Sequence, residues 1–488
     1  MCKFLNIRNI GKYFALLILI TLIIAQGCED KDKIDPVDAQ NRIINDWILD
    51  IMEEVYFWNT LIPPNANKSL KPDVFFNSLL KRPEDRFSVI YDNFQELLAS
   101  LMGVNREAGY DFNLGYLDEY EFNIIGYITY IKPGTPAEAA GIKRGDFFLR
   151  INNTQMNINN YGELLQATAN PHSLGILEAT GIRNVQLNVI EYAENPILLD
   201  TIYTHFPDKK IGYFVYNFFA RDRHTDGIAY EKELNNLFGK FKNETIDELI
   251  IDLRYNSGGT TITAQALASM ISGLPSSEIF GIEIFNDFVH SYYSARIGAN
   301  YNKMFFLNNI ERINEDDVVL ESVPINKLSN LKNLYLITSR QTASASELII
   351  NGLRPYMDNV ILVGDTTAGK NFGSWLIYET NPVKQRTNNW GMLPIVFKLE
   401  NNANFSDYGD GFEPAVRLHE TMAPEIKPLG NTDELLLAAT LDLIFGNSTA
   451  EQKNVGDKTK IIGSAIDRTP ARKNMYVYDR KNSLFRRD

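Results

Sequence analysis

The chain has 488 residues, more than one hydrophobic core usually serves, so about two to four domains are expected. Its composition, 44% hydrophobic and 22% charged, is ordinary for a globular protein and argues against global disorder. The formal net charge of −13 disfavours nucleic acid as a partner, because binding to phosphates needs a cationic face.

The N-terminus predicts an export signal. Lys3, Arg8 and Lys12 precede the apolar run YFALLILITLIIA, which is followed by Gln, Gly and Cys28. A positively charged start and a short apolar run are typical of signal peptides, and this run is too short to span a bilayer comfortably. The Gly-Cys end resembles a bacterial lipoprotein signal, in which Cys28 would be the lipidated first mature residue.

This interpretation predicts a lipoprotein signal peptide at 1–28 and a solvated linker at 29–38. The protein would then belong to the bacterial cell envelope, facing the periplasm or the surface and attached to the membrane by its lipid. Cys2 and Cys28 are the only cysteines, so the folded part has no disulfide, no thiol nucleophile and no Cys/His metal cluster.

Helical periodicity opens the mature chain. Apolar residues recur at the spacing of one helix face at positions Ile44, Trp47, Ile48, Ile51, Val55 and Trp58. Two further segments continue in the same style, which predicts an N-terminal helical domain at 39–112. The aromatic side chains in it are expected to form core.

Short β-rich runs and turns follow, and they predict a module of mainly β character at 113–196. Its segment PGTPAEAAGIKRGD combines a tight turn, one short helix closed by Gly141 and the start of another strand. This stretch resembles a PDZ domain, although NLGYL at 113–117 is a poor version of the carboxylate-binding loop. The resemblance implies binding of an extended peptide as an added strand. The alternative is a PDZ-like module that only packs against its neighbour.

Alternating apolar strands and helices predict an α/β core at 197–446. The remaining residues, 447–488, are polar, with ten Lys and Arg against five Asp and Glu from Gly446 onward. We expect them to form a poorly ordered extension.

The segment LITSRQTASASELIINGL, at 336–353, offers three hydroxyls after an apolar strand, on Thr342, Ser344 and Ser346. Ser344 to Glu347 also fits a capping box, with Ser at the N-cap and Glu at N3, which is a purely structural interpretation. The five histidines are scattered, and none falls within fifty residues of Ser344. A serine nucleophile here would therefore need another base.

Two other segments contain groups that could act as the base and as oxyanion donors. VGDTTAGKNFGS places Lys370 after a strand and a Gly-bearing turn, and a desolvated lysine can become a neutral general base. IIDLRYNSGGT ends a strand in Gly258 and Gly259, where bare backbone N–H groups can point at a developing oxyanion.

The motifs DLRYNSGG, SASE and GDTTAGK, in this order and with a PDZ module, resemble the carboxy-terminal processing (tail-specific) serine proteases. The segment GDGFEP at 409–414 is similar to a later segment of that family. The resemblance covers nearly the whole mature chain. It implies a crotonase-like (ClpP-like) α/β protease core, protein or peptide substrates, and no cofactor or metal.

Carried over by position, the resemblance makes Ser344 the nucleophile and Lys370 its base. The backbone N–H groups of Ala345 and Gly258 would form the oxyanion hole, with Gly259 as the alternative donor. Helix geometry agrees with the choice of Ser344, because a helix N-terminus favours negative charge on the attacking oxygen.

One position departs from the family pattern. Many members carry a glutamine four residues after the lysine, which orients it, and here that position is Ser374. A hydroxyl could still accept a hydrogen bond from Lys370, but its reach is shorter.

Two rival functions stay open from the sequence. The first is a catalytically silent PDZ-containing peptide-binding protein of the envelope, which the missing glutamine alone favours. The second is a crotonase-like acyl hydrolase or a binder of small apolar ligands, against which the PDZ module and the distant lysine argue.

Overall fold

The structure is a computed structural model that describes residues 36–206, 209–314, 318–379, 388–420, 426–446, 461–473 and 476–477. Cys28 and the expected signal peptide lie outside the described residues. Among the helices within those ranges, none combines the length and apolar character needed to span a membrane.

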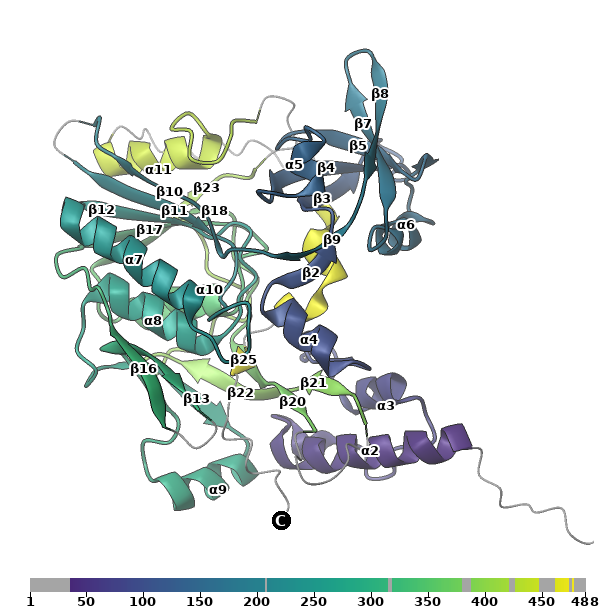
Figure 1. Ribbon diagram of the computed structural model, residues 1–488. Helices are drawn as coiled ribbons and strands as arrows, with labels where there is room; N and C mark the ends of the chain where they lie inside the picture. Colours follow the sequence, from purple (N-terminus) through teal and green to yellow (C-terminus); the bar gives the residue numbers. More distant parts are fainter. Residues whose placement is uncertain are drawn as a thin grey trace, which may run out of the picture.

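A six-stranded sheet forms the centre of the larger lobe (Figure 1). Its order is β10-β11-β12-β17-β18-β23, antiparallel between β10 and β11 and parallel from β11 onward. The bounds are β10 (Ile197–Tyr203), β11 (Ile211–Tyr216), β12 (Glu248–Asp252), β17 (Asn333–Thr338), β18 (Asn359–Gly364) and β23 (Val416–Arg417). Because parallel strands end at the same edge, the loops after β12, β17 and β18 become neighbours.

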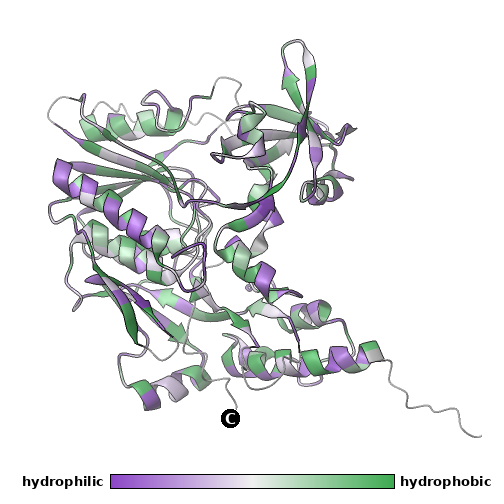
Figure 2. Cartoon of the chain, viewed as in Figure 1, coloured by the Kyte–Doolittle hydropathy of each residue, from purple (hydrophilic) through white to green (hydrophobic). Residues whose placement is uncertain are grey.

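Both faces of this sheet are buried, as expected for parallel strands made of continuous apolar runs. One face packs on α7 (Ala229–Glu244), α8 (Thr261–Ser272) and α10 (Ala345–Leu353), and the other on α11 (Leu435–Phe445). Figure 2 shows a difference in hydropathy between two of these helices, because α7 alternates polar and apolar residues whereas α8 is largely apolar.

The smaller lobe at the upper right of Figure 1 is the β-rich module. It contains β3 (Tyr110–Tyr116), β4 (Ile124–Ile131), α5 (Pro136–Ala139), β5 (Phe147–Ile151), β6 (Thr154–Gln155), α6 (Tyr161–Ala167), β7 (His172–Glu178) and β8 (Gly181–Leu187). These elements enclose a separate hydrophobic core. The short pair β2 (Val104–Glu107) and β9 (Ile190–Ala193) connects this lobe to the rest of the chain.

The N-terminal helices do not form a core of their own. The elements are α2 (Pro36–Val55), η1 (Asn59–Leu61), α3 (Pro72–Leu79), β1 (Val89–Tyr91) and α4 (Phe94–Leu101). The apolar faces of α2 and α3 enter the same buried cluster as α7 and α8. The N-terminal segment is thus packed into the larger lobe, because its amphipathic stripes need a partner surface.

Further strands complete that lobe. A five-stranded sheet has the order β14-β13-β22-β19-β25, and a three-stranded sheet has the order β1-β21-β20. The β15–β16 pair and α9 are further elements of this part of the chain. The bounds of all these elements are β13 (Ile279–Phe285), α9 (Asp287–Ile297), β14 (Lys303–Phe305), β15 (Asn309–Ile313), β16 (Val319–Pro324), β19 (Phe372–Trp375), β20 (Ile377–Tyr378), β21 (Gly391–Leu393), β22 (Ile395–Glu400) and β25 (Tyr476–Val477).

The C-terminal residues differ from the expected poorly ordered extension wherever the structure describes them. They form β24 (Ile461–Ser464), η2 (Ala465–Arg468), η3 (Pro470–Lys473) and β25. β24 joins the sheet of the smaller lobe, and β25 joins β19 in the larger lobe. Backbone pairing and a few buried side chains order this segment, although its overall composition is polar.

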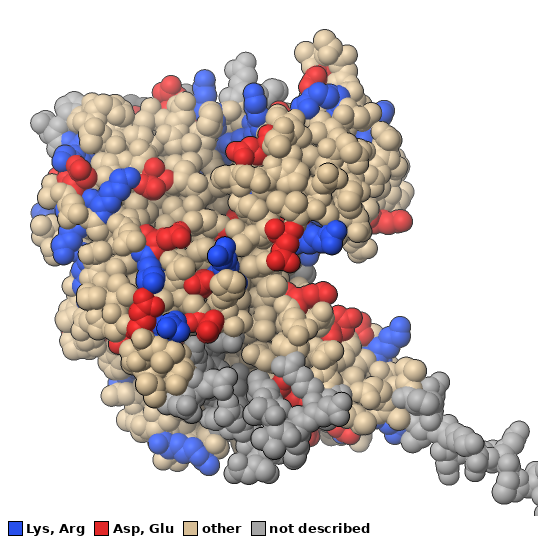
Figure 3. All heavy atoms as spheres, in the orientation of Figure 1, with Lys and Arg blue, Asp and Glu red and all other residues tan. Residues whose placement is uncertain are grey.

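The charged side chains of the described residues are interspersed over the face shown in Figure 3. Acidic and basic groups alternate there over both lobes. A mixed surface of this kind keeps a protein solvated without a large field of one sign.

Candidate active site

Ser344 lies at the turn between β17 and α10. It is the N-cap residue of α10, with φ of 64° and ψ of −113°. A non-glycine residue at positive φ is strained, and such strain gathers at functional turns. The side chain is fully buried, and its Oγ has no hydrogen-bond partner within the part of the chain that the structure describes.

The two neighbouring hydroxyls have structural partners instead. Ser346 Oγ donates to the Asn256 carbonyl at 3.3 Å, and Thr342 Oγ1 donates to the Leu253 carbonyl at 2.8 Å. Both hydroxyls therefore hold the loop after β12 against the loop after β17. Ser344 differs from them because its hydroxyl takes no part in this bracing.

Lys370 is completely buried, two residues before β19 begins. Its Nζ lies 4.5 Å from the centre of the Phe87 ring and donates to the Lys473 carbonyl at 3.0 Å. Desolvation lowers the pKa of Lys370 well below its ordinary value, and the carboxylates of Asp85 and Glu347 only partly oppose this. The site thus favours the neutral amine that a general base requires.

Glu347 joins the two segments. Its Oε2 accepts from the backbone N–H groups of Ser344 and Lys370, both at 2.8 Å. Its Oε1 accepts from the Gly369 N–H at 2.7 Å and from Thr367 Oγ1 at 2.6 Å. The sequence predicted Glu347 only as the N3 residue of a capping box. Its bonds to the segment of Lys370 have no local signal, because they connect residues twenty or more positions apart.

The glycine turn after β12 lies against Ser344. Gly258 has φ of 115°, and a Cβ built there would lie 2.6 Å from Ser344 Cβ and 2.9 Å from Ser344 Oγ. Its N–H donates to Asn256 Oδ1 at 2.9 Å. An oxyanion would therefore have to share this N–H with Asn256 or displace Asn256 from it. Ala345, the other expected donor, is the first residue of α10, where a backbone N–H has no intrahelical acceptor.

Ser374 is fully buried in β19, four residues after the lysine. Its Oγ has no hydrogen-bond partner among the described residues. The structure therefore gives no hydrogen bond through which this hydroxyl would orient Lys370, whereas the Lys473 carbonyl contacts the amine directly.

A cavity of about 590 Å³ opens beside these groups. Phe87, Ala343, Thr367 and Lys473 are among the residues that line it. Ala343 precedes Ser344, and Phe87 covers the amine of Lys370. The cavity therefore lies next to the segment of Ser344, although neither Ser344 nor Lys370 is among its lining residues.

The remaining motif residues support the loop that carries the glycines. Arg254 is buried and pairs with Asp252 at 2.7 Å, with Glu434 at 2.7 Å and with Glu420 at 3.0 Å. Glu420 also pairs with Arg144 of the smaller lobe. A buried arginine is stable only when its charge is matched in this way.

Three family descriptions match the chain at the places where these elements lie. Peptidase family S41 matches residues 210–380, the S41 N-terminal domain matches 43–89, and a PDZ domain matches 127–174. The chain belongs to peptidase family S41. Its fold is the mixed α/β protease fold of this family, with a PDZ domain and an N-terminal domain.

Two curated proteins that are similar to this chain are both named carboxy-terminal processing proteases. The carboxy-terminal processing protease CtpA of Bacillus subtilis is 25% identical over 250 residues, which are 50% of this chain and 45% of that protein. A carboxyl-terminal-processing protease of a Picosynechococcus species is 27% identical over 244 residues, 49% of each chain. This S41 chain thus spans about half the length of the curated relatives that it matches.

A solved structure extends the likeness over more of the fold. The crystal structure of a protein described as an S41 protease from Bacteroides fragilis has a TM-score of 0.63 and 26% identity, and the match covers 82% of this chain and 97% of that one. Among the described residues of this S41 family member, no group of three or more His, Cys, Asp and Glu side chains could hold a metal ion.

Proposed function

We propose that this S41 family member is an exported serine endopeptidase that hydrolyses peptide bonds with a Ser344–Lys370 dyad. One observation carries the proposal: the Glu347 carboxylate binds the backbone of both residues at once. A strained, buried serine and a desolvated lysine are thereby fixed to one acceptor.

In the proposed mechanism, Ser344 Oγ attacks the scissile carbonyl while the neutral amine of Lys370 accepts its proton. The N–H groups of Ala345 and Gly258, with Gly259 as the alternative, donate to the oxyanion. Lys370 then passes the proton to the leaving amine, and water hydrolyses the ester on Ser344. No metal or cofactor takes part in these steps.

The wider interpretation belongs to the same proposal. The parallel sheet with helices on both faces is in keeping with a crotonase-like (ClpP-like) core. The PDZ domain would engage the chain ends of protein substrates, and a lipid on Cys28 would hold the enzyme in the cell envelope. Ser374 would act as a spacer in the buried strand, because its hydroxyl has no partner among the described residues.

The test is incubation of residues 29–488 with an unfolded protein. We expect fragments from the unaltered chain and none from the Ser344→Ala variant, with both proteins equally folded by circular dichroism. Absence of cleavage by the unaltered chain, together with retained peptide binding, would instead support the catalytically silent alternative.

A further inference from the structure

The described C-terminal residues follow a path from the PDZ domain to the proposed dyad. β24 pairs antiparallel with β3, with Ile461 opposite Gly115 and Ser464 opposite Asn113. Without β24, β3 would be the outer strand of the PDZ sheet. An extended segment that adds a strand to a sheet edge is the geometry of a bound peptide.

Side chains of the same segment fill the PDZ surface next to that edge. Ala465 is buried in the PDZ core cluster, and Ile462 packs against the cluster. Arg468 donates to Thr168 at the end of α6 at 3.1 Å and lies 5.0 Å from the centre of the Phe112 ring of β3. The segment is thus bound between β3 and α6 by both backbone and side chains.

The chain then reaches the groups assigned to catalysis. Ser257 Oγ donates to the Arg472 carbonyl at 2.8 Å, and Lys370 Nζ donates to the Lys473 carbonyl at 3.0 Å. Further along, the Tyr476 N–H donates to the Gly259 carbonyl at 3.1 Å. Consecutive carbonyls of this segment are therefore bound by the oxyanion loop and by the proposed base.

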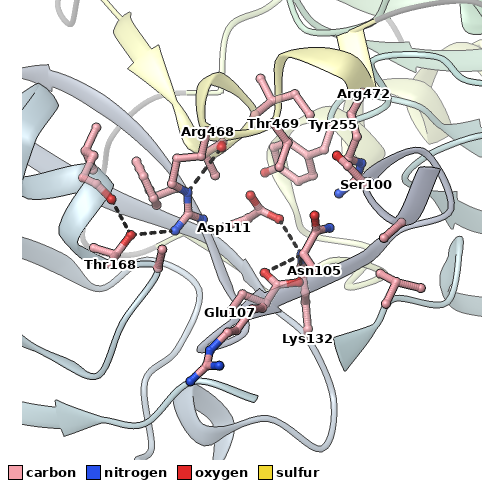
Figure 4. A pocket seen from close by; sticks show the side chains of 18 of the residues that line it. Ser100, Asn105, Glu107, Asp111, Lys132, Thr168, Tyr255, Arg468, Thr469 and Arg472 are labelled. Carbon is pink, nitrogen blue, oxygen red and sulfur yellow. Dashed lines mark hydrogen bonds and ion pairs between the residues drawn. The ribbon is translucent and has the colours of Figure 1, made fainter. Parts of the chain in front are cut away.

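Arg472 adds positive charge near a group of carboxylates, and Figure 4 shows it lining the same pocket as Glu107 and Asp111. Its guanidinium contacts Glu194 at 3.1 Å and lies 4.5 Å from the centre of the Phe218 ring. Glu194 belongs to a group of three carboxylates around the buried Lys132, the others being Glu107 at 2.8 Å and Asp111 at 3.6 Å. A single lysine leaves this group net negative, and Arg472 offsets one further charge.

From these contacts we propose that residues 461–473 and 476–477 are an intramolecular peptide ligand that occupies the substrate path, with Arg472 as its anchor. Protein substrates must displace it. Those that do so most readily offer an extended strand to β3 and a basic side chain to the cluster of Glu107, Asp111 and Glu194. The inference rests on the proposed function, because it takes the groups around Ser344 as the active site.

Binding of a labelled peptide tests whether the internal segment occupies the substrate path, and it does not depend on proteolytic activity. The full mature chain with Ser344→Ala is titrated against a fluorescein-labelled peptide with the sequence of residues 458–477. We expect Arg472→Glu, which weakens the internal segment, to bind this peptide at least about tenfold more tightly than its parent. Arg183→Glu makes the same charge reversal at an exposed ion pair on β8 and should bind like the parent.

Equal peptide affinity in all three proteins would overturn the proposal and make the segment a permanent part of the fold. A labelled peptide with Glu in place of Arg472 should bind at least about tenfold more weakly, and undiminished binding would also contradict the proposed anchor. If Arg472→Glu does not fold, Arg472→Ala takes its place in the same titration.

Labelling of Ser344 by a serine-reactive phosphonate separates this inference from the proposed function. In the chain that retains Ser344, Arg472→Glu should raise the labelling rate several-fold over the unaltered chain and over Arg183→Glu. Equal rates in the three proteins would contradict occupancy of the path. Absence of labelling in all of them would count against the nucleophile, and the binding titration would then decide the inference alone.

Discussion

At the scale of single residues, the hydroxyls of Ser344 and Ser346 differ in their contacts. Ser346 donates to the Asn256 carbonyl, whereas Ser344 Oγ has no hydrogen-bond partner among the described residues. A buried hydroxyl without a partner costs free energy, and such a cost persists where function requires it.

Replacement of each serine separates their roles. Ser346→Ala removes one long hydrogen bond, so we expect a loss of about 1 kcal/mol in stability and retained proteolysis. Ser344→Ala should abolish proteolysis with little change in stability. Thermal unfolding and digestion of an unfolded protein measure the two effects, and phosphonate labelling of Ser346 in the active chain would contradict the assignment.

Glu347 binds the backbone of both residues of the proposed dyad. Glu347→Ala leaves the buried N–H groups of Ser344, Gly369 and Lys370 without their acceptor. We therefore expect the free energy of unfolding to fall by about 3 kcal/mol or more, and proteolytic activity to be lost. Glu96→Ala is the matched control, since Glu96 is the N3 residue of α4 and is exposed. This control should lower the free energy of unfolding, measured with denaturant, by less than about 1 kcal/mol. Equal costs would show that Glu347 acts only as a helix cap.

At the scale of elements, the site is formed where three strands of the parallel sheet end. The loops after β12, β17 and β18 carry the glycines, the serine and the lysine, respectively. The N-terminus of α10 adds its partial positive charge beside Ser344. The fold therefore assembles the site from segments that are distant in sequence.

The glycine turn gives a prediction at this scale. Gly258→Ala places a methyl group 2.6 Å from Ser344 Cβ at a φ that L-residues rarely adopt, so proteolysis and stability should both fall sharply. Gly162→Ala is the control, because no atom lies within 4 Å of its added Cβ and it lies within α6. It should keep full activity and gain up to about 1 kcal/mol in stability. An active Gly258→Ala variant would exclude close packing of this turn on the nucleophile.

At the scale of the whole molecule, local pattern predicted some features and not others. Ser344 and Lys370 could be proposed because each follows an apolar strand with a distinctive turn. The link through Glu347 could not, since capping boxes are common and nothing local joins residue 347 to residue 370. The segment from 461 was missed because its few apolar residues reveal no partner strand, and the pairing with β3 is more than three hundred residues away.

Attachment to the membrane is a prediction about the whole chain. Cys28 lies outside the described residues and is the only cysteine at the end of the apolar run. Cys28→Ala should move the protein from the membrane fraction to the soluble fraction, because firm attachment requires several acyl chains at one site. Fractionation of cells with immunoblotting measures this. A processed variant that stays with the membrane would disprove the lipid anchor.

The pH dependence of Ser344 acylation in the unaltered chain and in Lys370→Arg tests the dyad most directly. Burial lowers the pKa of Lys370, so the amine should lose its proton well below pH 10, where an exposed lysine still holds it. The rate should therefore rise with pH through that lowered pKa and then level off. Lys370→Arg should be almost inactive at every pH, because guanidinium keeps its proton. A Lys370→Arg variant that acylates at a near-normal rate would contradict the dyad.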